Sequence, residues 1–387
     1  MYRSRLFQSL VVVALVILSG CGDPGGGDTN VRALSSSSTL QVPARMGSGA
    51  QVATSAHLVS LSGDGQDPFG EVVDLRTGAI EDVVGPEGRD LHVIRYEATA
   101  DRVIMVGFLG DAGDEYDPLP VERVSYSFDP SSRHWTELVL PSELSAKAVD
   151  VRVELAPGGP TGMAGVFGVG DGPFVLATVD QEGWTPVGTV DAETGEQRCA
   201  TDDAWYSLGA IVTDGGTPEA PYPSNIRLVE TRFEDGDGTD IALPPLRADV
   251  GAADVALGCT RSSTLIMTGS SGEPPPRLYA RRGGNDWEAI AAPPDDSPSW
   301  TTPWILSDPS SVLVVYARYD PAKFDVGSVE ALVISDDGTV RQFTDDLRDR
   351  SKMWSRGSGS LILVGPLSGD TDESDEASVD LTLLEAN

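Results

Sequence analysis

Basic side chains are scarce in this sequence, and nearly all of those present are arginines. The 387 residues include 60 Asp and Glu but only 27 Lys and Arg, which gives a formal net charge of −33. A surface this acidic repels phosphate backbones, so the composition argues against a nucleic acid as partner. The charge suits either plain solubility, in a salty environment for example, or a surface that binds cations or a basic partner.

Histidine and cysteine are also rare, with three of each. His57, His92 and His134 lie far apart and show no spacing typical of a zinc site. The sequence lacks a G-x-S-x-G nucleophile motif, a phosphate-binding glycine loop, a nucleotide fingerprint and a haem-binding cysteine pair. The acidic stretch "EDGDGTD" lacks the ligand spacing of an EF-hand and is better explained as a tight turn. We therefore predict no cofactor, no metal ligand and no catalytic residue.

Long apolar runs are absent except for Leu10–Leu18, which follows a basic N-terminus. This run is too short to cross a bilayer core of about 30 Å, but it suits the apolar region of a signal peptide. The next residues, Leu18-Ser19-Gly20-Cys21, resemble the lipobox of bacterial lipoproteins, in which the cysteine is acylated and becomes the new N-terminus. The resemblance implies a signal peptide over residues 1–20 and a palmitate-type anchor on Cys21 that attaches the chain to a membrane without spanning it.

The same resemblance implies a location in the cell envelope. Gly22 stands where inner-membrane lipoproteins of Gram-negative bacteria usually carry a retention aspartate, which favours the outer membrane if the cell is Gram-negative. Residues 21–38 are Gly-rich and then Ser-rich with no periodicity, a composition typical of a flexible tether. We expect one folded domain over residues 39–387.

No helical periodicity occurs in that domain. Short runs rich in Val, Ile, Leu and aromatic residues alternate with turns rich in Gly, Pro, Asp and Ser, which predicts an all-β protein. Turns such as "DPSSRHW", "DQEGW" and "RRGGNDW" recur about every fifty residues. Residues 90–141 show the unit in full, as four antiparallel strands with a long loop after the second, and this predicts the blade of a β-propeller.

The same unit fits residues 47–84, 149–193, 198–245, 253–293 and 301–346. The C-terminal segment supplies only three strands, while Thr39–Arg45 remains unassigned at the other end. Pairing the two would close the ring and remove exposed strand edges. We therefore predict a seven-bladed propeller whose last blade is completed by an N-terminal strand, with six blades as the alternative.

Trp135, Trp184 and Trp287 each open the fourth strand of a unit, where an indole can fill the space between blades. The stretch "YSFDPSSRHW" resembles the kelch repeat, in which Tyr, an Asp-Pro turn and Trp recur. Other units lack the double glycine of that repeat. The resemblance therefore implies a kelch-like propeller in which the tryptophans are structural.

Cys199 and Cys259 form an even pair in a chain predicted to be exported, which permits a disulfide. Alignment of the units places both at the end of a first strand in neighbouring blades. Equivalent positions can still lie beyond the limit of about 7 Å between Cα atoms, so two buried thiols are an equal alternative.

Long loops follow the second strand of six units and should therefore share one side of the ring. Function in such folds usually lies in loops on a rigid scaffold. The acidic residues of these loops form a candidate binding surface, named here the acidic rim: Asp64, Asp67, Asp111, Asp114, Glu115, Asp117, Asp370, Asp372, Glu373, Asp375 and Glu376.

Two functions fit this organisation. The first is a membrane-anchored, non-catalytic binding or scaffold module whose acidic rim docks a protein, a glycan or divalent cations. The alternative is an envelope glycan hydrolase or lyase of the propeller kind, which would need two carboxylates about 5 to 9 Å apart. The fold cannot choose between them, but the first uses the anchor, the tether and the one-sided loops together.

Overall fold

The computed structural model describes the following residues: 32–43, 51–62, 69–86, 91–110, 120–145, 148, 151–169, 173–190, 197–210, 226–246, 255–270, 273–291, 304–308, 311–320, 325–343, 352–355, 361–368 and 378–386. Nearly all of them lie in strands and turns, and α2 (Ser142–Ser145) is the one helix in these ranges. The predicted all-β class is therefore confirmed. No helix among these residues is long and apolar enough to span a bilayer.

Five sheets have four strands each, paired antiparallel in sequence order. The first sheet contains β2 (Val52–Ala53), β3 (His57–Leu61), β4 (Gly70–Asp74) and β5 (Ile80–Val83). The second contains β6 (Leu91–Ala98), β7 (Val103–Leu109), β8 (Arg123–Asp129) and β9 (His134–Leu138). The third contains β10 (Val151–Pro157), β11 (Met163–Val169), β12 (Phe174–Val179) and β13 (Trp184–Val190). The fourth contains β14 (Gln197–Ala200), β15 (Ala204–Ala210), β16 (Ile226–Arg232) and β17 (Gly238–Ile241). The fifth contains β18 (Val255–Cys259), β19 (Ser263–Ser270), β20 (Glu273–Arg282) and β21 (Glu288–Ala291).

The remaining strands form one eight-stranded sheet in the order β22-β23-β24-β25-β1-β28-β27-β26. Its members are β22 (Trp304–Asp308), β23 (Ser311–Asp320), β24 (Asp325–Ser335), β25 (Val340–Phe343), β1 (Arg32–Pro43), β26 (Lys352–Ser355), β27 (Leu361–Ser368) and β28 (Ser378–Ala386). The N-terminal strand β1 pairs antiparallel with β28, for example Thr39 with Thr382, so the predicted pairing of the two chain ends is present.

The strand β1 is longer than the sequence suggested. It begins at Arg32, so residues 32–38, which we expected in the tether, belong to the folded part. The Ser-rich composition at Ser35–Ser38 has little strand propensity, but hydrogen bonds to the backbone of β28 do not depend on side chains. The pairing partner, not the local sequence, therefore sets the start of this strand.

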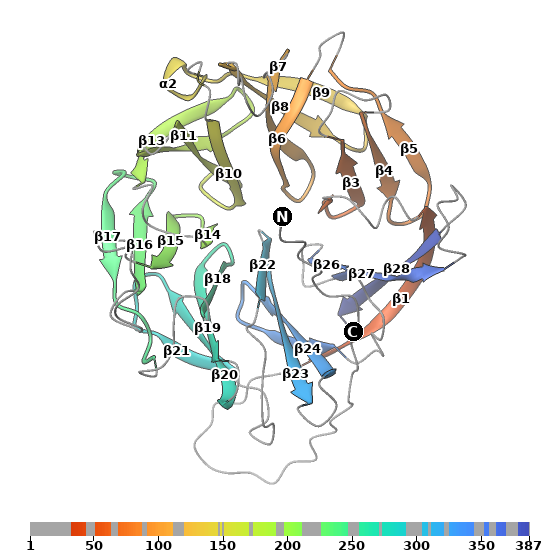
Figure 1. Ribbon diagram of the computed structural model, residues 1–387, viewed down its shortest axis with the longest axis vertical. Coiled ribbons are helices and arrows are strands. Elements are labelled where there is room, and N and C mark those ends of the chain that lie inside the picture. The colour runs from red at the N-terminus through yellow and green to blue at the C-terminus, as the bar shows by residue number, and fades with distance from the viewer. Residues whose placement is uncertain are drawn as a thin grey trace.

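Figure 1 shows the sheets arranged around a ring, with the first strand of each unit innermost. The innermost strands touch in chain order, β2 with β6, β6 with β10, and so on through β14, β18, β22 and β26, and β26 touches β2. Consecutive sheets of this kind, set radially around an axis, define a propeller-like fold.

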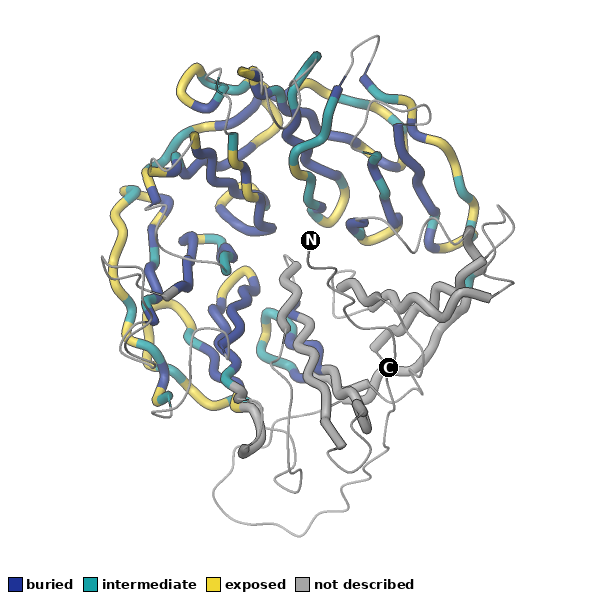
Figure 2. Tube along the Cα trace, viewed as in Figure 1, coloured by how far each residue is buried: buried dark blue, intermediate teal, exposed yellow. Residues whose placement is uncertain are grey.

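The core lies between neighbouring sheets. Val153 and Leu155 of β10, for example, pack with Ile104 and Val106 of β7, and each of these side chains is buried. Burying a side chain of this size stabilises the fold by roughly 1.5–3 kcal/mol. In Figure 2 buried residues follow the strands inside the ring, while exposed residues gather on outer strands such as β5 and β17.

Outer strands of consecutive units meet in parallel at two places. The end of β25 pairs with the start of β1, Arg341 with Arg32 through Phe343 with Leu34. Val139, just after β9, forms a parallel bridge with Gly183, just before β13. In both cases the end of the fourth strand of one unit pairs with the start of the fourth strand of the following unit. The strand β1 therefore takes the place of the fourth strand in the unit that contains β28.

Candidate functional site

The ring has two sides that differ in their connections. We call the side with the turns between first and second and between third and fourth strands the short-turn side. The other is the long-loop side. Four of the six predicted long loops connect a second strand to a third, namely β3 to β4, β7 to β8, β15 to β16 and β27 to β28. The prediction is wrong for the other two units, because β19 pairs with β20 up to Ser270 and Glu273, and β23 pairs with β24 up to Asp320 and Asp325, so paired strands take up most of these segments. Because antiparallel strands alternate in direction, these connections share one side.

The residues of the acidic rim lie outside the described part of the chain. This applies to all eleven: Asp64, Asp67, Asp111, Asp114, Glu115, Asp117, Asp370, Asp372, Glu373, Asp375 and Glu376. The strands that carry these loops are described, and they fix the side of the ring on which each loop begins and ends.

Two buried arginines lie at strand ends on the long-loop side. Arg123, the first residue of β8, donates from Nη1 to the carbonyl of Gly168 (3.3 Å), and its guanidinium carbon lies 5.7 Å from the ring centre of Phe167. Burial lowers the pKa of Arg123 to about 10. Arg198 of β14 forms an ion pair with Glu154 and lies 4.9 Å from the ring centre of Phe174. Sequence reasoning missed both, because nothing local marks an arginine whose partners come from another sheet.

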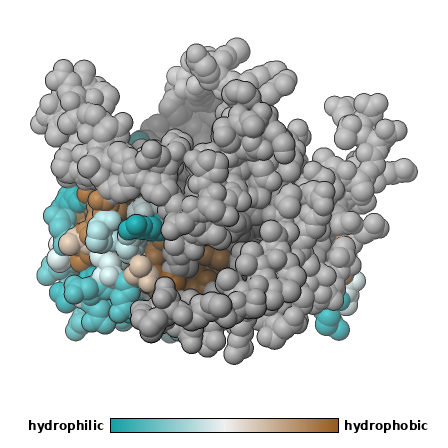
Figure 3. Space-filling model, turned by 90° about the horizontal axis from the view of Figure 1, so that it is seen from below, coloured by the Kyte–Doolittle hydropathy of each residue, from teal (hydrophilic) through white to brown (hydrophobic). Residues whose placement is uncertain are grey.

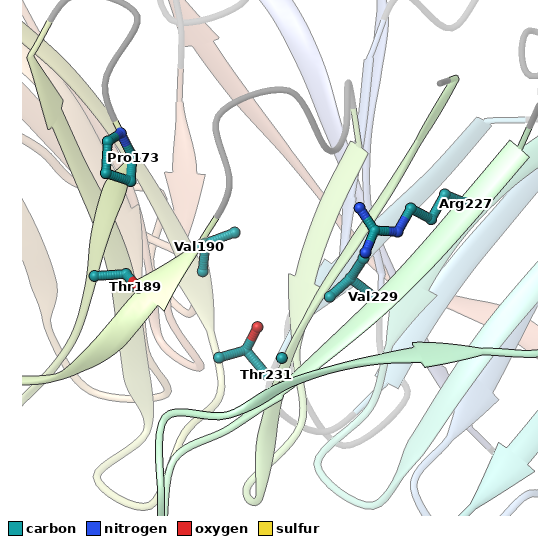
Figure 4. A pocket seen from close by; sticks show the side chains of 7 residues that line it. Pro173, Thr189, Val190, Arg227, Val229 and Thr231 are labelled. Carbon is teal, nitrogen blue, oxygen red and sulfur yellow. The ribbon is translucent and has the colours of Figure 1, made fainter. Parts of the chain in front are cut away.

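A cavity of about 300 Å³ lies between the third and fourth sheets and extends from Arg227 at the long-loop end of β16 to Thr231 near its short-turn end. Its lining residues are Pro173, Thr189, Val190, Arg227, Val229, Thr231 and Gly238. Figure 4 shows Thr231 and Arg227 of β16 across from Thr189 and Val190 of β13. The guanidinium of Arg227 already donates from Nε to Asp240 (2.5 Å). The cavity therefore offers hydrogen-bonding groups but no pair of carboxylates for acid–base chemistry.

Threonines organise the short-turn side. Thr54, Thr99, Thr201 and Thr260 each follow a first strand, and each hydroxyl accepts a hydrogen bond from the backbone N–H three residues later, at 3.0 to 3.2 Å. The side chain thus holds the turn that leads into the second strand. The sequence has a threonine at this place in four units, but a single threonine near a turn is too common to predict the contact.

Backbone hydrogen bonds link these turns from one sheet to the next. The N–H of Ser55 donates to the carbonyl of Ala100 (2.8 Å), and that of Asp202 donates to Arg261 (2.7 Å). In both pairs the residue after the threonine of one sheet meets the residue after the threonine of the next. Asp202 and Arg261 also form an exposed ion pair at 3.2 Å. The repeat therefore connects its own copies around the ring.

Aspartates stabilise the turns between third and fourth strands. The carboxylates of Asp74, Asp129 and Asp180 each accept hydrogen bonds from the N–H groups two and three residues later, at 2.8 to 3.3 Å. Burial alone would raise the pKa of Asp74, but the N–H groups of Arg76 and Thr77 outweigh it and the pKa is lowered. These carboxylates hold the fold together.

Asp336 joins the fifth sheet to the eight-stranded sheet. From the turn after β24 its Oδ1 accepts hydrogen bonds from the hydroxyl of Thr260 (2.8 Å) and from the N–H and hydroxyl of Ser262 (2.8 and 2.7 Å). Burial alone would raise the pKa of Asp336, but the hydrogen bonds from Ser262 and Thr260 outweigh burial, and the pKa is lowered. A single carboxylate thus connects two units through three charge-assisted hydrogen bonds.

The tryptophans lie between units, as predicted. The indole of Trp135 donates to the carbonyl of Val84 in the preceding sheet (2.8 Å). Trp184 donates to the hydroxyl of Ser125 (2.9 Å), and Trp287 donates to the carbonyl of Ala242 (2.6 Å). Their role is therefore structural.

Cys199 and Cys259 form a disulfide between the innermost strands of the fourth and fifth sheets, with 5.6 Å between their Cα atoms. Both residues are fully buried. Of the two alternatives left open by the sequence, the structure contains the bridge. It lies next to the Thr201 and Thr260 turns, on the short-turn side.

The described part of the chain contains no group of three or more residues that could hold a metal ion. His57 is buried, and burial followed by the charge of Arg133 lowers its pKa. His92 stacks on Phe108 at 4.9 Å between ring centres. The histidines therefore lie in separate structural surroundings.

One polar cluster between the fourth and fifth sheets was not predicted. Arg281 donates to Glu230 (2.6 Å), and the hydroxyl of Tyr206 donates to the same carboxylate (3.0 Å). Burial raises the pKa of Tyr206 to about 12. A phenol this weakly acidic and this buried is a poor nucleophile, so the cluster contributes to packing between sheets.

Comparison with known proteins identifies no family. No family model matches the chain, and no curated protein matches it. Similar solved structures include the N-terminal domain of Nup159, at 10% identity and a TM-score of 0.41, over 93% of this chain and 98% of that one. An ancestral GH74 enzyme has 12% identity and a TM-score of 0.43, over 87% of this chain and 48% of that one. Dipeptidyl peptidase 4 of Porphyromonas gingivalis has 11% identity and a TM-score of 0.41, over 83% and 56%.

Proposed function

We propose that the ring is a seven-bladed β-propeller. Five four-stranded sheets and an eight-stranded sheet that divides at the β25–β1 contact amount to seven units. Seven innermost strands touch in a closed cycle. At the point of closure, a methyl group on Gly78 would contact Leu40 at 3.4 Å, so β1 packs on the turn of the first sheet. Gly236 of the fourth sheet packs likewise on Val187 and Gly188 of the third.

We further propose that this propeller is a membrane-anchored binding or scaffold module that acts through its acidic rim. Acylated Cys21 would hold the chain in the cell envelope, on the outer membrane in a Gram-negative cell, and the rim would dock a protein, a glycan or divalent cations. The partner would meet a rigid scaffold whose sheets are joined by hydrogen bonds on the opposite side.

The observation that carries this proposal is the different use of carboxylates on the two sides. Four aspartates of the short turns, Asp74, Asp129, Asp180 and Asp336, accept hydrogen bonds within or between units. The three loops that carry the acidic rim contain, by sequence, eleven rim carboxylates and no basic residue. Such an excess of charge produces a negative potential suited to a cationic or basic partner.

The test is cross-linking of the lipidated protein in intact envelopes, followed by recovery of its partners. One variant changes Asp111, Asp114, Glu115, Asp117, Asp370 and Asp372 to Asn or Gln. A control of equal charge makes the same change at exposed acids elsewhere, namely Asp82, Glu182, Glu234, Asp237, Asp286 and Glu288. We expect one defined partner that the rim variant loses and the control retains. A partner retained by both variants would contradict the proposal.

A further inference from the structure

The place where the chain enters the ring has a consequence for its orientation on a membrane. The strand β1 begins at Arg32, which pairs with Arg341, the second residue of β25. The turn that leads into β25 lies on the short-turn side. In the parallel bridge between Val139 and Gly183, Gly183 corresponds to Arg32, and it too lies in a turn on this side. The chain therefore enters the ring at its outer edge on the short-turn side.

The segment between this entry point and the proposed anchor is short. Ten residues, 22–31, separate Cys21 from Arg32. A chain of this length spans at most about 40 Å when fully extended, and a Gly-rich chain has an average reach of about 20 Å. Beside the entry point, β27 and β28 have eight and nine residues, which makes the ring about 25–30 Å thick between its two sides at this place. The average tether is therefore too short to bring the long-loop side to the bilayer.

The distribution of arginine favours the same orientation. The short turns carry, within them or directly beside them, Arg76, Arg102, Arg133, Arg232, Arg261 and Arg282. Several are well exposed, with 84% of the Arg76 side chain and 53% of the Arg261 side chain accessible. They offset part of the carboxylate charge on this side, whereas the three loops that carry the acidic rim contain no basic residue. An anionic lipid surface therefore repels the long-loop side more strongly.

We propose that the short-turn side is the membrane-facing surface of this protein and that the acidic rim points away from the bilayer. The inference rests on the proposed lipid anchor at Cys21, and it specifies where the partner of the rim must come from. A partner would approach from the aqueous compartment, with the rim presented at the far side of the ring. Figure 3 shows the ring edge-on, and the described surface in this view carries both hydrophilic and hydrophobic residues.

The two ends of β11 provide a matched pair of labelling sites. Thr161 is exposed in the turn before this strand, on the short-turn side, and Val169 is its last residue, 42% exposed, on the long-loop side. Thr161→Cys and Val169→Cys each introduce one reactive thiol, because Cys199 and Cys259 are bonded to each other. Seven residues separate the two labels by up to about 20 Å along the strand.

The experiment measures energy transfer from a donor on each thiol to an acceptor on lipid headgroups. The lipidated full chain is placed in vesicles of phosphatidylethanolamine with a minor share of phosphatidylglycerol. We expect the label at Thr161 to lie closer to the bilayer than the label at Val169, by up to about 20 Å. Equal distances, or the reverse order, would overturn the orientation while leaving the anchor intact. Failure to associate with vesicles would overturn the anchor and the orientation together.

A variant with a longer tether distinguishes the cause. An insertion of Gly-Ser repeats after Gly27 leaves every described residue unchanged. If tether length sets the orientation, the difference in distance between the two labels shrinks as the tether grows. A difference that persists would show that a surface contact sets the orientation, and it would overturn the argument from the tether.

Discussion

The two sides of the ring use acidic side chains in different ways. On the short-turn side Asp74, Asp129 and Asp180 hold turns, and Asp336 holds two units together. On the long-loop side the loops of the acidic rim contain, by sequence, eleven carboxylates and no basic residue. The net charge of −33 is therefore unevenly distributed, because one share lies in turns that stabilise the fold and another in the loops that we propose to bind a partner.

The comparison shows where the repeat places its recurring turn contacts. The threonine and aspartate turns, the backbone hydrogen bonds between turns of neighbouring sheets, and the disulfide lie at the short-turn end of the strands. The long-loop end also has inter-sheet hydrogen bonds, such as that of Arg123 with Gly168 and that of Gln197 with Val255. Loops on a rigid scaffold of this kind can vary in length and charge without loss of the ring.

The largest expected effect comes from removing the strand that closes the ring. Internal deletion of Arg32–Pro43 leaves the tether in place but exposes the edges of β25 and β28. We expect loss of cooperative unfolding and self-association through the free edges, as measured by calorimetry and light scattering. A deletion variant that stays monomeric with an unchanged melting temperature would contradict both the role of β1 and the seven-unit ring.

The disulfide should be the next strongest contribution on the short-turn side. It closes a loop of 60 residues, and replacing Cys199 and Cys259 by serine should lower the free energy of unfolding by roughly 4 kcal/mol. Urea denaturation under oxidising conditions measures the effect, with the parent protein under reducing conditions as the comparison. A loss below about 1 kcal/mol would show that the hydrogen bonds of the neighbouring turns suffice.

Asp336 tests a carboxylate with a structural role. Asp336→Ala removes three hydrogen bonds to Thr260 and Ser262 and should cost about 2 kcal/mol at neutral pH. Because the pKa of Asp336 is lowered in the folded state, its contribution is present above the unfolded value of about 4 and is lost as the pH falls through the folded pKa. The difference between parent and variant should therefore shrink on acidification. Urea titrations at several pH values measure it, and a difference independent of pH would refute the charge-assisted bonds.

Glu97 of β6 is the exception on this side, since the fold opposes its charge. Burial raises its pKa to about 7, against a smaller lowering by Arg95. A raised pKa contributes stability below the unfolded value of about 4.3 that is lost as the pH rises through 7. Glu97→Gln should therefore stabilise the protein by about 1–2 kcal/mol at pH 8 and by little at pH 4. Melting temperatures of the parent and the variant at these two pH values measure the effect. Destabilisation of the variant at pH 8 would contradict the prediction and would show that the attraction between Glu97 and Arg95 outweighs the cost of burial.

The sequence was sufficient to predict the all-β class and the four-stranded antiparallel sheets, because alternation and turns are local. It predicted the contacts of Trp135 and Trp184, since an aromatic residue at the same place in each unit has one space to fill. The start of β1 at Arg32 and the bonds of Asp336 could not be predicted, because both depend on a partner strand or turn remote in sequence. The rim stays a prediction from loop composition, and the described strands define only its side of the ring.

The most direct test of the divided roles compares the thermal unfolding of two variants with equal numbers of changes. One replaces the rim residues Asp111, Asp114, Asp117 and Asp370 by alanine, and the other replaces Asp74, Asp129, Asp180 and Asp336. We predict that the rim variant keeps the melting temperature of the parent, as expected if these carboxylates have no structural role, while the other variant loses on the order of 1 kcal/mol per site. A rim variant destabilised as much as the short-turn variant would show that the rim carboxylates hold the fold and would contradict the account.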